Sequence, residues 1–144
     1  MLFRMMEKKD LNQLLVLFNE FVEESLAEYD VDLNIDFINK IAEQYIETSF
    51  VAEKDGNIVG VLAGSILSIP TFKTPIYQEQ VWFFSKEHRL HGVGLLRYAE
   101  KTLKDCDVTH IIMANMVNSK ADKVEKFYKR VGYKPMETHY IKAL

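Results

Sequence analysis

Residues 86–97 read KEHRLHGVGLLR and carry two glycines directly before an apolar helical pattern. A glycine-containing turn between a strand and a helix leaves backbone N–H groups unpaired at the helix start, where they carry positive partial charge. Such a start binds anions, usually phosphate, and glycine allows the ligand to approach the backbone closely. Lys86 and Arg89 would add positive charge. Without any ligand, Gly92 and Gly94 would equally shape a tight turn from strand to helix.

Two other phosphate-binding motifs are excluded at this stretch. A dinucleotide fingerprint, G-x-G-x-x-G, needs a third glycine at position 97, which is Arg97. A P-loop needs a Gly-Lys pair followed by Ser or Thr, and the sequence has none. The glycine stretch therefore belongs to another kind of anion site or to none.

The glycine stretch resembles the acyl-CoA-binding motif of the GNAT superfamily of N-acyltransferases, in which a strand precedes Q/R-x-x-G-x-G/A and a helix. Arg89, Gly92 and Gly94 take the motif positions. The connection is shorter than in the family, so aligning the helix instead places Leu90 and Gly92 at the glycine positions. A second stretch, FYKRVGYKP at residues 127–135, resembles the superfamily's C-terminal aromatic motif. The resemblance covers essentially the whole chain and is nearest to small stand-alone bacterial or phage members.

The resemblance implies an α/β (α+β) fold with a mixed, mostly antiparallel sheet of roughly six to seven strands flanked by about four helices. It also implies acetyl-CoA as cofactor. The pantetheine arm would lie along the end of the fourth strand, where a backbone N–H would stabilise the oxyanion. The pyrophosphate would bind the backbone amides that lead into the helix. The implied cofactor-binding residues are Phe84, Ser85, Lys86, Arg89, Leu90, His91, Gly92, Val93, Gly94, Asn118 and Tyr128.

Tyr128 matches the family tyrosine that hydrogen-bonds the CoA sulfur and protonates the departing thiolate. A phenol with a pKa near 10 is a reasonable general acid for that step. The pattern alone favours a core position, because Val124, Phe127, Tyr128 and Val131 form one helical stripe. Asn118 has a similar alternative, since Asn118 and Ser119 could cap the last helix instead of contacting pantetheine.

Glu79 stands where many relatives carry a glutamate that accepts the amine proton, so it is the predicted general base. A solvated glutamate beside a loop is the alternative. His88, His91 and His110 are weaker candidates for the base. The four histidines show no metal-binding spacing, and no metal site is predicted. The acceptor would be a small-molecule or peptide amine, with Phe72 and Tyr77 as walls of its site. The acidic balance mildly favours a cationic acceptor.

The composition is that of an ordinary globular protein. The length of the chain predicts a single domain over residues 1–144. The net charge of -3 and the pI of about 5.8 give no general attraction to nucleic acid or to an anionic membrane. The single cysteine, Cys106, excludes an intrachain disulfide. No signal peptide and no apolar run of membrane-spanning length is visible, so a cytoplasmic location is expected.

The pattern along the chain predicts the element order β-α-α-β-β-β-α-β-α-β, a mixed sheet with helices on its faces. Asp10 is the expected N-cap of the first long helix, and Asp55-Gly56-Asn57 is the expected hairpin turn. Gly132 is the expected end of the last helix. The expected elements are a strand at 2–5, helices after 10 and after 34, strands around the turn at 55–57, a loop at 68–78, a strand at 79–85, a helix around 95–103, a strand at 109–116, a helix around 124–131 and a closing strand at 136–144.

Three functions follow from these readings. The leading one is an N-acetyltransferase that moves an acetyl group from acetyl-CoA to a primary amine by direct transfer in a ternary complex. The alternative is a GNAT-fold module of weak or no activity that binds CoA or a protein partner. An unrelated nucleotide-binding α/β domain would need a parallel doubly wound sheet, which the hairpin argues against. The resemblance also admits a homodimer, paired through the apolar C-terminal segment.

Overall fold

The computed structural model describes residues 1–29, 35–117, 120–142 and 144, which fall into an N-terminal unit (Met1–Ala114) and a C-terminal unit (Asn115–Leu144). The elements of the N-terminal unit are β1 (Leu2–Met5), α1 (Leu11–Ser25), α2 (Ile35–Tyr45), β2 (Phe50–Lys54), β3 (Asn57–Leu67), β4 (Ile76–Phe84), the 3-10 helix η4 (Lys86–His91), α3 (Gly92–Asp105) and β5 (His110–Ile112). The C-terminal unit contains α4 (Ala121–Arg130). A single domain over residues 1–144 stays a prediction.

The sheet of the N-terminal unit has five strands in the order β1-β2-β3-β4-β5. The first four pair antiparallel, whereas β4 and β5 run parallel. Asp55 and Gly56 form the hairpin turn between β2 and β3 with φ of 52° and 81°. Both residues therefore have the left-handed backbone of a tight two-residue turn. The predicted hairpin and the predicted mixed, mostly antiparallel sheet are confirmed.

The predicted strand count and three strand boundaries are wrong. Residues 136–142 form no strand, and their side chains are exposed. A strand needs an edge to pair with, and the described part of the C-terminal unit contains no strand. β5 covers only His110–Ile112 rather than 109–116, and β4 begins inside the expected loop, at Ile76. Ile76 to Gln78 extend because they pair with both β3 and β5.

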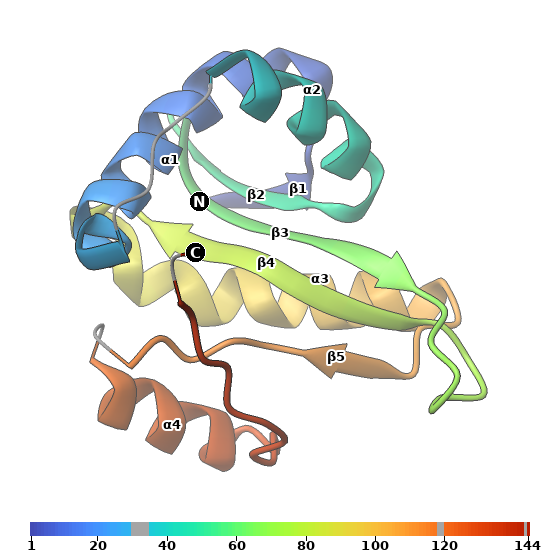
Figure 1. Ribbon diagram of the computed structural model, residues 1–144. Helices are drawn as coiled ribbons and strands as arrows, with labels where there is room; N and C mark the ends of the chain where they lie inside the picture. The colour runs from blue at the N-terminus through green and yellow to red at the C-terminus, as the bar shows by residue number, and fades with distance from the viewer. Residues whose placement is uncertain (30–34, 118–119, 143) are drawn as a thin grey trace. The chain divides into compact units, whose positions relative to one another are not determined.

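Helices cover both faces of the five-stranded sheet (Figure 1). On one face, Leu17 of α1 packs in a cluster with Val61 and Phe83 from the sheet. On the other face, Tyr98 of α3 meets the ring of Phe50 edge-on with centroids 6.1 Å apart. The sheet is thus the central layer of the N-terminal unit. No helix in the described residues is long and apolar enough to cross a membrane.

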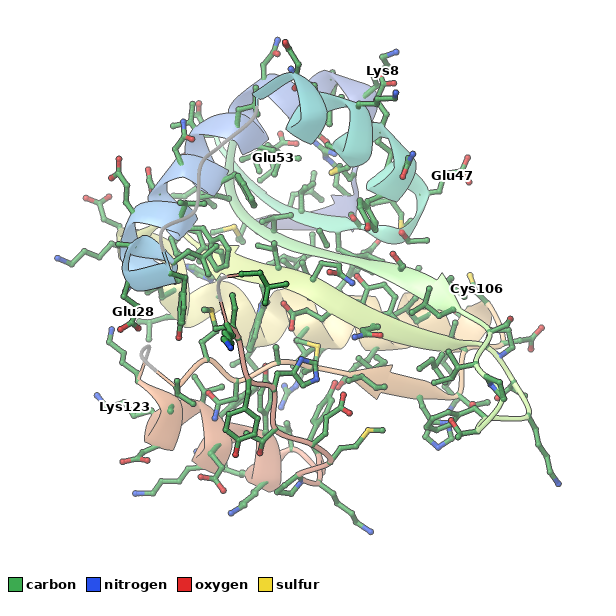
Figure 2. The ribbon with its side chains drawn as sticks, in the orientation of Figure 1. Lys8, Glu28, Glu47, Glu53, Cys106 and Lys123 are labelled. Carbon is green, nitrogen blue, oxygen red and sulfur yellow. The ribbon has the colours of Figure 1, made fainter. Side chains whose placement is uncertain are left out.

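A partly buried ion cluster joins β1, β2 and the start of α1. Arg4 donates to both carboxylate oxygens of Asp10, at 2.7 and 2.8 Å, and its Nη2 donates to Glu53 Oε2 at 2.8 Å. Figure 2 shows Glu53 on the sheet face that α1 and α2 cover. Burial works against ionisation of Asp10, yet the hydrogen bonds from Arg4 and from Glu7 N hold its pKa below the usual value. Asp10 precedes α1 as predicted, but its side chain binds Arg4 instead of capping α1.

The C-terminal unit is built around α4. Gly132 follows α4 with φ of 99°, which confirms the predicted glycine at the helix end. Tyr133 N donates to Tyr128 O at 2.9 Å and closes that end. The Tyr128 ring lies 5.7 Å from Phe127 and 5.3 Å from Tyr133, measured between centroids. Three aromatic rings thus pack together at the end of α4.

Candidate active site

β4 and β5 separate halfway along β4. The parallel ladder joins Ile76–Gln78 to His110–Ile112 and ends there. β4 continues to Phe84 and pairs with β3 throughout that length. Within the described residues of the N-terminal unit, no strand pairs with the other edge of β4 from Glu79 to Phe84. We call residues 79–84 the open edge of β4, because the ladder with β5 does not reach them.

A β-bulge in β4 lies at the start of the open edge. Ala63 pairs with Val81 and the next residue, Gly64, pairs with Glu79, so Gln80 is the extra residue. A bulge bends its strand and increases the local twist. β4 therefore changes direction where its ladder with β5 ends.

The bulge also determines which side chains share a face. Tyr77 lies on the α3 face, because its ring contacts Phe50 with centroids 6.2 Å apart. Trp82 is on the same face, since it lies beneath the first residue of α3. Val81 packs on the opposite face, in the cluster under α1. Strict alternation would put Tyr77 and Val81 on one face, and the extra residue breaks it.

Glu79 stands at the first position of the open edge. Its Oε2 accepts a hydrogen bond from Ala114 N at 2.7 Å. Although the side chain keeps some solvent exposure, the surrounding protein desolvates the carboxylate. Burial raises the pKa of Glu79 to about 7, and the hydrogen bond from Ala114 opposes that rise. A carboxylate that titrates near neutral pH can accept a proton from an amine.

The two residues predicted to line the acceptor site are in different surroundings. Tyr77 is fully buried, and its hydroxyl has no hydrogen-bond partner among the described residues. Burial, and to a smaller extent the charge of Glu79, raises the pKa of Tyr77 above its usual value. Phe72 is half-buried and meets the ring of His110 edge-on, with centroids 4.8 Å apart. Tyr77 is thus part of the interior, and Phe72 packs against β5.

Gly92 and Gly94 are not in a turn, which corrects the predicted glycine loop. η4 fills the connection from Lys86 to His91, and Gly92 begins α3 with φ of -54°. A Cβ at Gly92 would lie 3.2 Å from the Trp82 ring, and one at Gly94 would lie 2.6 Å from the Phe3 ring. Both glycines therefore allow close packing of α3 on the sheet, with less room at Gly94 than at Gly92, and neither has an unusual backbone angle.

The groups predicted to bind pyrophosphate already have partners within the protein. Gly92 N donates to Arg89 O. The Arg89 guanidinium forms an ion pair with Glu24 of α1 and lies 5.8 Å from the centroid of the Phe83 ring. A phosphate that bound Arg89 would have to replace the carboxylate of Glu24.

The other predicted cofactor residues of this unit surround the end of β4. Phe84 is buried at the strand end, and Ser85 Oγ lies 3.0 Å from His88 Nδ1. Leu90 is exposed over 93% of its surface. Lys86 and His91 are exposed, and Val93 is half-buried. The structure brings Phe84 through Gly94 together as one continuous segment that follows the open edge.

The remaining predicted site residues lie beyond Ala114. Tyr128 is buried within the aromatic cluster at the end of α4. Asn118 lies outside the described residues. Among the described residues, no group of three or more His, Cys, Asp or Glu side chains could hold a metal ion.

Sequence reasoning missed four residues that shape this region. Phe3 and Trp82 pack against the glycines of α3, Glu24 pairs with Arg89, and Ala114 donates to Glu79. The apolar character of Phe3 and Trp82 was visible in the sequence, but their contact with a glycine pair was not. The donor of Ala114 is a backbone amide, which leaves no trace in residue type.

The model of the acetyltransferase (GNAT) family matches residues 11–133. The chain belongs to this family. The match confirms the resemblance drawn from the two motifs, and a search of curated proteins found no significant match. The family match therefore assigns the chain to the GNAT family and goes no further than that level.

Solved structures support the GNAT fold over the whole chain. A ribosomal-protein-alanine N-acetyltransferase from Brucella melitensis biovar Abortus 2308 aligns with a TM-score of 0.76 and 14% identity, over 99% of this chain and 97% of that one. A putative acetyltransferase from Agrobacterium tumefaciens str. C58 aligns with a TM-score of 0.74 and 18% identity, over 100% of both chains. An aminoglycoside N-acetyltransferase in complex with CoA aligns with a TM-score of 0.72 and 14% identity, over 99% of this chain and 93% of that one. At these identities the likeness establishes the fold.

Proposed function

We propose that this GNAT chain transfers an acetyl group from acetyl-CoA to a primary amine by direct transfer in a ternary complex. The observation that carries the proposal is the open edge of β4, which begins at the desolvated carboxylate of Glu79 and leads directly into η4 and α3. A strand edge beyond the ladder with β5 and a titratable carboxylate at its head are what the reaction needs of this part of the protein.

The open edge suits an extended ligand that carries amide groups. The pantetheine arm of CoA contains two amides, and backbone groups along a strand edge can bind them like an added strand. A backbone N–H of β4 would then stabilise the oxyanion formed at the thioester carbonyl. The structural relative that contains CoA supports this choice of cofactor. Acetyl is the acyl group that the names of the relatives suggest.

The reaction divides between a base and an acid. Glu79 accepts a proton from the acceptor ammonium, and the amine nitrogen attacks the thioester carbon. The C–S bond breaks as the tetrahedral intermediate collapses, and the nitrogen releases its second proton to solvent as the amide forms. Tyr128 donates a proton to the departing thiolate, a role that rests on the family motif. With the base at the head of the open edge, the amine has to approach near Glu79.

The acceptor class is a small-molecule or peptide amine. The names of two structural relatives supply one example of each, an aminoglycoside and the alanine of a ribosomal protein. The net charge of -3 supports a cationic acceptor through long-range attraction. Nucleic acid and membrane surfaces are not proposed as partners, and a homodimer and a cytoplasmic location stay predictions.

A second candidate is a GNAT module of weak or no activity that binds CoA or a protein partner. One observation favours it: the Gly92 amide and the Arg89 side chain, both predicted phosphate ligands, are engaged by other groups of the protein. Phosphate binding would have to displace these partners, which reduces affinity for the cofactor.

Release of the CoA thiol tests the two candidates. The protein is mixed with acetyl-CoA and either an aminoglycoside or a peptide that begins with alanine, and the N-acetylated form of the peptide serves as the matched control. Direct transfer predicts thiol release that depends on a free amine and yields an acetylated product of the expected mass. Absence of amine-dependent release with both acceptors, together with measurable CoA binding, would favour the second candidate.

The pKa of Glu79 predicts the pH dependence of kcat/KM for the acceptor. Below pH 7 the carboxyl is protonated and cannot accept a proton, so the rate rises about tenfold per pH unit and levels off above pH 7. Replacement of Glu79 by Gln should lower the rate by roughly 10²–10⁴ and remove this titration. A Glu79→Gln variant with an unchanged rate and profile would rule out Glu79 as the base.

A further inference from the structure

The end of the ladder between β4 and β5 is a defined fork in the sheet. Gln78 and Ile112 are the last paired residues. Beyond them β4 remains a strand to Phe84, whereas residues 113 and 114 are no longer part of β5. Two strands that separate in this way must satisfy the backbone groups that the ladder no longer pairs.

At the fork, a side-chain hydrogen bond follows the last backbone hydrogen bonds of the ladder. The first residue of β4 beyond the ladder is Glu79, and its Oε2 accepts the Ala114 N–H at 2.7 Å. The hydrogen bond crosses the fork from β4 to the chain that leaves β5. Because a carboxylate reaches further than a backbone carbonyl, it can bind this amide while the two backbones move apart.

Two features next to Glu79 favour this crossing bond. Gly64 is the cross-strand neighbour of Glu79 on β3, so the residue directly opposite the carboxylate has no side chain. Gln80, the extra residue of the bulge, follows immediately and bends β4. The bend in β4 and the hydrogen bond across the fork therefore occur at the same place.

We propose that Glu79 is a positioning residue that fixes the fork between β4 and β5 through its hydrogen bond to Ala114 N. The bond holds β4 and the departing chain at a set separation, and so it defines the width available to a ligand along the open edge. The choice of acetyl-CoA as the ligand rests on the proposed function. The geometry of the fork does not depend on that choice. The bond uses Oε2, and among the described residues no hydrogen bond to Oε1 is found, so Oε1 can accept a proton in the reaction.

Two substitutions separate the positioning role from the role as base. Glu79→Gln removes the base but keeps an amide oxygen that can accept the Ala114 N–H. Glu79→Leu fills similar space and offers no acceptor, and it suits a desolvated position. Glu47→Leu, the same change at an exposed glutamate outside the open edge, is the matched control. Thermal unfolding of each variant confirms that it is folded before it is compared.

Hydrogen exchange at the Ala114 amide and calorimetric titration with acetyl-CoA are the two readouts. In Glu79→Leu, exchange at Ala114 should accelerate about tenfold and acetyl-CoA should bind several-fold more weakly. In Glu79→Gln and Glu47→Leu, both quantities should stay within about twofold of the wild type, although Glu79→Gln loses turnover.

Equal behaviour of Glu79→Gln and Glu79→Leu in exchange and in binding would overturn the positioning role. Unchanged exchange at Ala114 in Glu79→Leu would overturn it as well. Failure of the wild type to bind acetyl-CoA would contradict the proposed function alone, since exchange at Ala114 tests the fork without any ligand.

Discussion

The turn between β2 and β3 and the start of α3 both depend on glycine, for opposite physical reasons. Gly56 has a φ of 81°, and nothing lies within 4 Å of the place where its Cβ would be. Gly92 has an ordinary helical φ of -54°, and Gly94 lies within the same helix, where a Cβ would be 2.6 Å from the Phe3 ring. At the turn, glycine is required for its positive φ, although a Cβ would have room. At the helix start, φ is ordinary, and glycine is required because a Cβ would have little room.

This difference shows what holds the helix behind the candidate site in place. The backbone of α3 approaches the sheet closely because Gly94 rests on Phe3 of β1 and Gly92 on Trp82 of β4. Close approach aligns the start of α3 with the end of β4, where the resemblance implies the cofactor phosphates. The glycines of the motif can thus serve packing and ligand binding together, and substitutions can separate the two.

The largest effect is expected for Gly94→Ala. The added methyl group collides with the Phe3 ring, and overpacking of this kind costs about 2 kcal/mol in the free energy of unfolding. Urea unfolding measures the loss, and Phe3→Leu in the same chain should recover part of it because the smaller side chain makes room. A double variant no more stable than the sum of its single changes would contradict the contact.

A smaller effect is expected for Gly56→Ala at the hairpin turn. There the methyl group has space, but an L-residue at φ of 81° is strained, which costs about 1 kcal/mol. Gly56→Asn is the matched control, because asparagine tolerates the left-handed region and should lose less stability. If alanine and asparagine were equally stable in urea unfolding, the backbone angle would not be the reason for glycine.

The smallest effect is expected for Gly92→Ala. Its methyl group would lie 3.2 Å from Trp82, a tight contact that opposes the gain of about 1 kcal/mol from replacing glycine in a helix. The two terms nearly cancel, so the unfolding free energy should change by less than about 0.5 kcal/mol. A loss as large as that of Gly94→Ala would show that both glycines are equally confined, and the distinction within α3 would disappear.

Sequence patterns predicted the elements whose signals are local. The hairpin at Asp55-Gly56, the long helices and the glycine after α4 were predicted because periodicity and turn chemistry act within a few residues. The closing strand at 136–144 was wrong because alternation alone does not provide an edge to pair with. The predicted glycine loop was wrong because a motif gives only residue types. It does not say whether glycine is required for its backbone angle or for the absence of a Cβ.

The candidate site was predicted in part for the same reason. Phe84 through Gly94 could be placed after a strand and before a helix, and the structure has them there. The partner of Arg89, Glu24, lies on a different helix, and the partner of Glu79 is the backbone amide of Ala114. Contacts between residues far apart in the chain, and contacts to backbone groups, leave no signal in one sequence.

The measurement that tests the account most directly is calorimetric titration with acetyl-CoA of the wild type, Leu90→Glu and Val16→Glu. Leu90 and Val16 are 93% and 63% exposed, so each substitution adds one negative charge without disturbing the core. If the cofactor phosphates bind beside Leu90, the wild type and Val16→Glu bind with micromolar Kd and Leu90→Glu binds at least about tenfold more weakly. Equal affinity of the two variants, or absence of binding to the wild type, would contradict an acyl-CoA site at the start of α3.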